Sequence, residues 1–188
     1  NGASISASIG GKCVDTSMGL TPLEGLIMGT RSGDLDPAII EYLCNHENLT
    51  VSEMLNILNK KSGVLGISGL SNDYRDLLEG EENGNQDAHN ALDVLVYRII
   101  KYIGAYHVAI GGADAIALTA GAGENNFVVR GRIVEGLSAL GIKLNEAANT
   151  VRGEELLLST PDSTIPVWVV PTNEELRIAR ETAAVVEK

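Results

Sequence analysis

The stretch "DAIALTAGAGENNFVVRGRIVEGLSALGI", residues 114–142, changes from a continuous apolar run to a helical pattern across two glycines. It predicts a strand over 114–121 and a helix that begins at Glu124. The stretch "IPVWVVPTNEELRIARETAAVVE", residues 165–187, repeats the order of apolar strand, cap and helix. Strands that alternate with helices run parallel, so the sequence predicts an α/β protein.

The rest of the chain predicts a hairpin and several helices. Small and apolar side chains alternate on both sides of Gly10 and Gly11, which predicts two antiparallel strands over 3–9 and 12–17. Apolar spacing predicts three helices, and Thr50 and Glu53 resemble a capping box for the second of them. The predicted helices cover Asp36–Cys44, Ser52–Asn59 and 86–110. With antiparallel and parallel strands in one chain, we expect a mixed sheet flanked by helices.

Two segments between these elements are expected to be irregular. Residues 60–72 are punctuated by glycine and predict a loop, with a short helical turn after Asp73. Residues 79–87, "EGEENGNQD", predict a mobile, exposed connection.

Two strand-to-helix junctions could bind a ligand, because helix N-termini at the carboxyl ends of strands present free N–H groups to anions. "TAGAGENN", residues 119–126, lacks the third glycine of a Rossmann fingerprint, and no GxxxxGK[ST] phosphate loop occurs. A plain turn that needs glycine is the alternative. The glutamates of "PTNEE", residues 171–175, could hold magnesium or only complement the helix dipole.

Two loops also carry polar side chains suited to binding. In "MGTRSGDLDP", residues 28–37, Gly29 and Gly33 shape a loop that presents Arg31, and the alternative is a surface ion pair of Arg31 with Asp34 or Asp36. "SNDYRD", residues 71–76, could grip a nucleoside by stacking and ribose hydrogen bonds, or could be a capped helix start.

Composition narrows the function classes. With 25 acidic against 14 basic residues, the net charge is −11, which argues against nucleic-acid binding. It favours a small ligand, and backbone amides and magnesium would have to neutralise any phosphate charge of that ligand. No apolar run could span a membrane and no signal peptide is visible, so we expect a soluble, cytoplasmic protein. The cysteines and histidines show no metal-ligand spacing; they are Cys13, Cys44, His46, His89 and His107. The chain opens inside a strand without a methionine, which predicts a fragment.

Five segments together resemble the acetate kinase family, and they cover nearly all of the chain in order. They are "NGAS", "DTSMGLTPLEGLIMGTRSGDLDP", "LNKKSGVLGISGLSNDYRD", "IGGADAIALTAGAGEN" and "TPDSTIPVWVVPTNEELRIARET". The resemblance implies a ribonuclease-H-like (actin-like ATPase) domain over residues 1–188, the C-terminal nucleotide-binding domain of an acetate kinase. The N-terminal domain of that family, which supplies the acetate pocket and further catalytic residues, is not in this sequence.

Site residues follow from the resemblance one by one. Asn1 matches the asparagine of the family's "HLGNGAS", which would contact the phosphates, and Gly2 keeps the backbone close. Arg31 matches the arginine that stabilises the transferring phosphoryl group. Asp73, Tyr74 and Arg75 match the loop that binds the adenosine in the family. Tyr74 stands where the family usually has phenylalanine or methionine.

The remaining matches lie at the two strand-to-helix junctions. The family's "GIGEN" turn under the adenosine and phosphates matches Gly121, Gly123, Glu124 and Asn125, and Ala122 replaces its isoleucine. Glu174 matches the glutamate that orders magnesium. The implied cofactors are ATP or ADP and Mg²⁺.

The implied reaction is reversible, in-line phosphoryl transfer from MgATP to acetate, giving acetyl phosphate and ADP. The 188 residues alone are expected to be inactive, because they hold half of the active site. The resemblance and the apolar surface of the 86–110 helix also imply a homodimer. Three alternatives stay open. They are a propionate or butyrate kinase, a non-catalytic actin-like nucleotide-binding interaction domain and a metal-dependent hydrolase.

Overall fold

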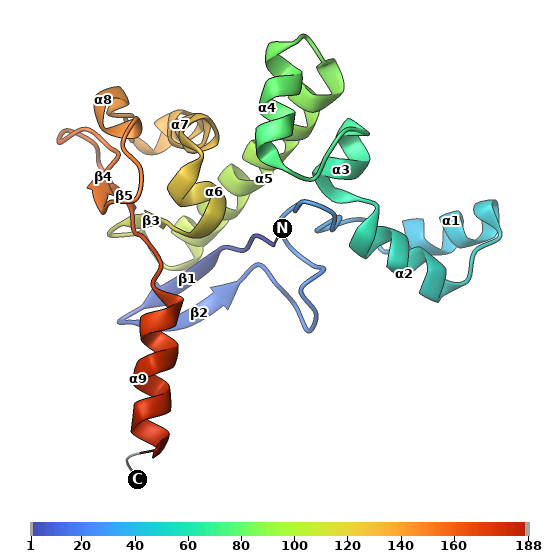
Figure 1. Ribbon diagram of the computed structural model, residues 1–188, viewed down its shortest axis with the longest axis horizontal. Coiled ribbons are helices and arrows are strands. Elements are labelled where there is room, and N and C mark those ends of the chain that lie inside the picture. The colour runs from blue at the N-terminus through green and yellow to red at the C-terminus, as the bar shows by residue number, and fades with distance from the viewer. Residues whose placement is uncertain (1, 187–188) are drawn as a thin grey trace. The chain divides into compact units, whose positions relative to one another are not determined.

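The computed structural model describes residues 2–186, and it begins with the predicted hairpin (Figure 1). Strand β1 (Ser6–Ile9) pairs antiparallel with β2 (Lys12–Thr16). The connecting Gly10 and Gly11 have φ of 57° and 76°. A two-residue turn with left-handed φ at both positions suits glycine, which has no Cβ to clash. The hairpin prediction is confirmed.

The chain divides into two compact units, Asn1–Ala113 and Asp114–Lys188. After the hairpin, the first unit is helical: α1 (Ala38–Glu47), α2 (Val51–Lys60), α3 (Gly63–Ser68), α4 (Tyr74–Glu82) and α5 (Gln86–Ala109). The second unit contains β3 (Ile116–Leu118), α6 (Ala120–Asn125), α7 (Phe127–Gly136), η1 (Ser138–Leu140), α8 (Glu146–Asn149), β4 (Leu156–Leu157), β5 (Val167–Val169) and α9 (Glu174–Val186). The predicted α/β class is confirmed, and the single domain over residues 1–188 stays a prediction.

Helices α2 and α5 of the first unit begin at side-chain caps, and one of these caps was predicted. Thr50 Oγ1 accepts from the Glu53 amide at 3.2 Å, and Glu53 Oε2 accepts from the Thr50 amide at 2.8 Å. This is the predicted capping box. Asn85 caps α5 by accepting from the amides of Asp87 and Ala88. The long helix is therefore confirmed, with a buried face of Ala88, Ala91, Leu92, Leu95, Val96, Ile103 and Tyr106.

Two predictions about this unit are wrong in part. Residues 60–72 are not all loop, because α3 forms within them. The amides of Val64 and Leu65, near its start, donate to the carbonyls of the loop that begins at Met28, and these bonds hold the short helix in place. Residues 79–87 are mostly exposed, as predicted, but they do not form a connection of their own. α4 and α5 take up all but Asn83, Gly84 and Asn85, and both helices pack against each other.

The second unit is built on a small mixed sheet with the order β3-β5-β4. β3 and β5 run parallel with Leu118 opposite Val169, as predicted, and β4, which was not predicted, is antiparallel to β5. The Val170 amide donates to the Leu118 carbonyl at 2.9 Å. Both parallel strands therefore end at the same edge, where the segments leading to α6 and α9 begin.

The helix predicted from Glu124 differs in its bounds. It begins earlier, at Ala120, so the predicted strand over 114–121 shortens to β3. It also breaks at Asn126, whose φ of −109° and ψ of 90° are extended and whose side chain caps α7 by accepting from Val129 N. The helix breaks here because the Asn126 side chain binds a backbone amide and so competes with continuation of the helix.

None of the helices formed by residues 2–186 is long and apolar enough to cross a membrane.

Candidate functional site

The loop that carries Arg31 has its backbone fixed from several sides. Ser62 N donates to Thr30 O, while Thr30 Oγ1 donates to Asn59 O at 2.9 Å. The α3 amides described above donate to Met28 and Gly29. A Cβ on Gly63, at φ +65°, would lie 2.2 Å from Met28 O, so only glycine allows this approach. The loop is therefore held rigidly between α2 and α3.

The Arg31 side chain is anchored by one of its nitrogens. Nη1 donates to the Pro22 carbonyl at 2.7 Å, and a Cβ placed on Gly2 would lie 3.2 Å from Nη2. Gly2 thus lets the N-terminal backbone run alongside the guanidinium, and its predicted place at the phosphates stays a prediction. Nη2 and Nε donate to no other residue that the structure describes. These donors point to an anionic ligand, since arginine binds planar oxyanions through two parallel N–H groups.

The alternative ion pairs of Arg31 do not form. The Asp34 carboxylate binds Arg98 and Tyr102, and Asp36 Oδ1 accepts from Ala38 N at the start of α1. Asp34 and Asp36 are therefore committed elsewhere.

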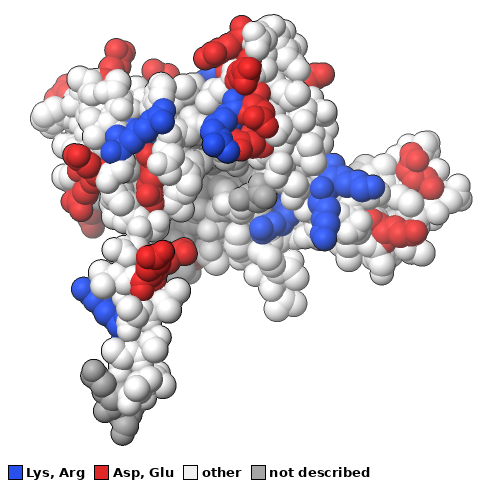
Figure 2. Space-filling model, in the orientation of Figure 1, with Lys and Arg blue, Asp and Glu red and all other residues white. Residues whose placement is uncertain are grey.

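Positive charge also collects next to this loop. Lys60 and Lys61 end α2 directly before Ser62, and neither forms an ion pair within residues 2–186. Figure 2 shows basic side chains gathered over the α2–α3 junction. In a chain of net charge −11, this local excess attracts anions to the Arg31 loop.

The segment of Asp73, Tyr74 and Arg75 forms the start of α4. Asp73 Oδ1 accepts from the Arg75 amide at 2.9 Å, and the Arg75 guanidinium binds both Asp73 oxygens. The side-chain and backbone hydrogen bonds from Arg75 lower the pKa of Asp73 to about 2. Burial raises the pKa of Tyr74. The predicted alternative of a capped helix start is therefore observed, and nucleoside binding by these residues stays a prediction.

In the second unit, Glu124 joins the two predicted junctions. Its Oε1 accepts from Thr172 N at 2.8 Å, Thr172 Oγ1 at 2.9 Å and Ala120 N at 2.6 Å. The Thr172 amide is the main cause of the lowered pKa of Glu124. Glu124 therefore stays ionised and fixes the segment before α9 against α6.

The glycines of α6 have different surroundings. A Cβ on Gly121 would meet nothing within 4 Å, whereas a Cβ on Gly123 would lie 3.1 Å from the Leu118 carbonyl carbon. Gly123 thus packs closely on β3, while Gly121 leaves open space at the end of the strand. Asn125 is exposed beside them. The open side can admit a ligand.

One residue that the sequence reasoning missed supports this junction from inside. Arg130 is fully buried, and its Nη1 donates to Glu124 O at 2.9 Å. Its other nitrogens donate to Asn149 Oδ1 and to the carbonyls of Asn149 and Val151. None of these acceptors is a carboxylate. The signal in the sequence was weak: one arginine on the otherwise apolar face of "VVRGRIV".

Glu174, the predicted magnesium residue, is the exposed first residue of α9. Within residues 2–186, no group of three or more His, Cys, Asp or Glu side chains could hold a metal. Mg²⁺ needs no such group, because it is commonly bound through one or two carboxylates, water and substrate phosphates. One exposed glutamate fits that requirement. Asn1, the remaining predicted contact, lies outside the described residues.

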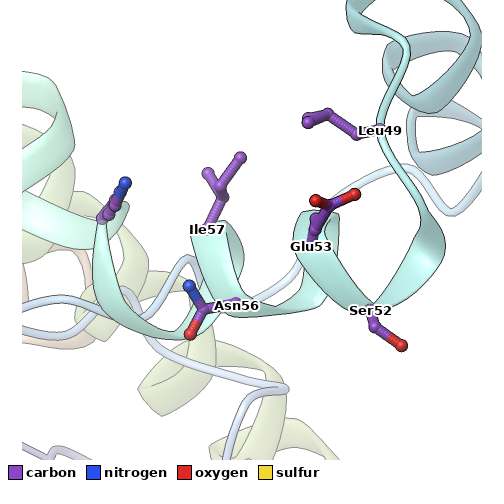
Figure 3. A pocket seen from close by; sticks show the side chains of 6 residues that line it. Leu49, Ser52, Glu53, Asn56 and Ile57 are labelled. Atoms are coloured by element: carbon purple, nitrogen blue, oxygen red, sulfur yellow. The ribbon is translucent and has the colours of Figure 1, made fainter.

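A separate hollow of about 430 Å³ lies along α2 (Figure 3). It is lined by Leu49, Ser52, Glu53, Asn56, Ile57 and Lys61. None of these was predicted to bind a ligand, and Glu53 is already used in the capping box. Of these lining residues, Lys61 also belongs to the basic cluster of Lys60 and Lys61 beside the Arg31 loop.

Comparisons with known proteins show the family of the chain. The sequence model of the acetokinase family matches residues 1–180. The chain is 57% identical over 188 residues to an acetate kinase of Helicobacter hepaticus and 59% identical over 188 residues to one of Dictyoglomus thermophilum. It covers 47% of each of these relatives, so it spans about half the length of the curated relatives it matches.

Solved structures show the same fold. A Porphyromonas gingivalis acetate kinase superposes with a TM-score of 0.94 at 44% identity, over 99% of this chain and 47% of that one. A Francisella tularensis propionate kinase superposes with a TM-score of 0.90 at 40% identity, over 96% of this chain and 46% of that one. The fold of the 188 residues is the fold of the matching half of these kinases.

Proposed function

Since the chain belongs to the acetokinase family, we propose that its 188 residues are the actin-like, nucleotide-binding domain of an acetate kinase. The intact protein would catalyse reversible phosphoryl transfer from MgATP to acetate, giving acetyl phosphate and ADP. The observation that carries the proposal is the Arg31 loop, whose clamped backbone leaves guanidinium donors available to an anion. Propionate is the second candidate acceptor of the phosphoryl group, because a propionate kinase is among the structural neighbours.

The two units would supply residues with different roles. In the first unit, Arg31 would stabilise the negative charge that develops on the transferring phosphoryl group, with Asn1 and Gly2 at the phosphates. Asp73, Tyr74 and Arg75 would line the adenosine. In the second unit, the open side of Gly121, with Gly123, Glu124 and Asn125, would support the nucleotide, and Glu174 would hold Mg²⁺, which neutralises phosphate charge when bound.

The proposal is tested by assaying the intact protein for ADP formation with acetate, propionate and butyrate in turn. We expect the highest kcat/KM with acetate. We expect the 188 residues alone to bind MgADP weakly in calorimetry and to transfer no phosphate, because the residues that complete the site would lie outside them. Nucleotide binding by the intact protein without transfer to any carboxylate would favour a non-catalytic interaction domain.

A second prediction concerns Glu174 and magnesium. Glu174→Gln in the intact protein removes a carboxylate charge, so the Mg²⁺ concentration at half-maximal rate should rise severalfold. Glu175→Gln, one position further along the same exposed helix start, is the control and should leave it unchanged. If both variants titrate like the parent and lose only about 0.3 to 1 kcal/mol of stability, the glutamates only complement the helix dipole.

We also propose a cytoplasmic homodimer. Support comes from the first unit, where α5 carries exposed apolar side chains in addition to its buried face. They are Val94, Tyr97 and Val108. A helix with apolar residues on more than one face is typical of an interface between subunits.

A further inference from the structure

Helix α5 carries three polar side chains at four-residue spacing: Arg98, Tyr102 and Tyr106. Residues four apart lie on the same face of a helix, so the three form one row. The two tyrosine rings meet edge to face, with centroids 5.6 Å apart. The row lies within the first unit and reaches two other segments of it.

The first segment is the Arg31 loop, which the row reaches through Asp34. Asp34 Oδ2 accepts from Arg98 Nη2 at 2.8 Å and from the Tyr102 hydroxyl at 2.7 Å. Burial, followed by the hydrogen bond to Asp34, raises the pKa of Tyr102, which therefore remains a donor at neutral pH. Asp34 Oδ1 accepts from Gly25 N at 2.8 Å. One carboxylate thus joins α5 to the loop and to the backbone at Gly25.

The second segment is β2, reached by Tyr106. Burial, the charge of Asp15 and a hydrogen bond to Asp15 raise the pKa of Tyr106 to about 12. Asp15 lies in β2, opposite Ala7 of β1. The N-terminal backbone that leads into β1 passes the Arg31 guanidinium at Gly2. Tyr106 therefore faces the hairpin whose first strand follows that backbone.

The link from Asp34 to Arg31 is short and stiff. Only Ser32 and Gly33 lie between them, and Gly33 has φ +68°. A Cβ on Gly33 would lie 2.5 Å from the carbonyl oxygens of both Gly25 and Leu26. A shift at Asp34 would consequently move the loop as one piece.

We propose that Asp34, Arg98 and Tyr102 are positioning residues that set the reaction rate through Arg31 without touching substrate. This inference rests on the proposed function of Arg31. A displaced guanidinium still attracts the nucleotide but no longer meets the charge that develops during transfer, so kcat falls more than KM changes.

The test uses Tyr102→Phe in the intact protein, because phenylalanine keeps the ring and removes only the donor. We expect kcat with acetate to fall by about 3- to 10-fold and KM for ATP to change less than twofold. Tyr42→Phe is the control, since Tyr42 lies on α1, is 61% exposed and belongs neither to the row nor to the proposed interface; its kcat should not change. Arg98→Gln removes the other donor to Asp34 and should give the same kcat loss if Tyr102→Phe does not fold.

A double variant separates this inference from the proposed function. In an Arg31→Lys background, Tyr102→Phe should have no further effect on kcat, because it acts through Arg31. A slow Arg31→Lys enzyme with an unimpaired Tyr102→Phe enzyme would overturn the positioning role alone. Equal, additive losses would also overturn it. A fully active Arg31→Lys enzyme would overturn both the role of Arg31 and the inference built on it.

Discussion

Arg31→Lys in the intact protein is expected to lower kcat by roughly 100-fold or more while KM for ATP changes little. Lysine keeps the positive charge but loses the planar fork that binds two oxygens at once. The clamped loop would present the shorter, three-donor ammonium group in place of that fork, and Nη1 would no longer be held by Pro22 O. Loss of kcat with an unchanged KM is the pattern of an interaction made in the transition state.

Steady-state kinetics in both reaction directions measure this effect. Arg177→Lys is the control, because Arg177 is an exposed residue of α9 whose ion pair among the described residues is with Glu181, four positions on. It should leave kcat unchanged, since exposed pairs of this kind contribute at most about 1 kcal/mol to stability. An Arg31→Lys enzyme that turns over within twofold of the parent would show that the loop is only a turn.

The predictable parts of the fold are the elements whose structure is determined by interactions between residues close together in the sequence. The alternation around Gly10 and Gly11 predicted the hairpin, and Thr50 with Glu53 predicted a helix start, because both signals act over three or four residues. The parallel pairing of β3 with β5 followed from the repeated order of strand and helix. These rules do not require knowledge of distant contacts.

The parts that were missed depend on distant contacts. α3 is a glycine-rich stretch made helical by carbonyls some 35 positions earlier in the chain, and β4 consists of two residues paired with β5. For the site, the rule that parallel strands end at one edge predicted a crevice there, which stays a prediction. The two junctions do meet at this edge, because Glu124 accepts from Thr172. No local pattern indicated that Asp34 would bind α5 across 64 and 68 positions.

The buried arginine of the second unit leads to the largest stability effect that we expect. Arg130→Met should lower the free energy of opening this unit by about 3 to 5 kcal/mol. Methionine fills much of the volume but donates nothing, so the partly buried acceptors of Arg130 would lose their donor. They are the carbonyls of Glu124, Asn149 and Val151 and the Asn149 side chain. Apolar replacements of buried ion pairs are often neutral because both partners are removed together, but here the acceptors remain.

Hydrogen exchange of the α7 amides measures this opening free energy without requiring both units to unfold in one step. Arg152→Met is the matched control. Arg152 is exposed and lies over the Phe127 ring at 5.2 Å, so its loss should cost less than about 1 kcal/mol. Because Arg130 also holds the Glu124 carbonyl, the variant should loosen α6, and the Thr172 amide, which Glu124 accepts from, should exchange faster as well. If α7 protection in Arg130→Met stays within 1 kcal/mol of the parent, the four hydrogen bonds of Arg130 do not hold the junction. The position of Glu124 would then be set by Thr172 and Ala120.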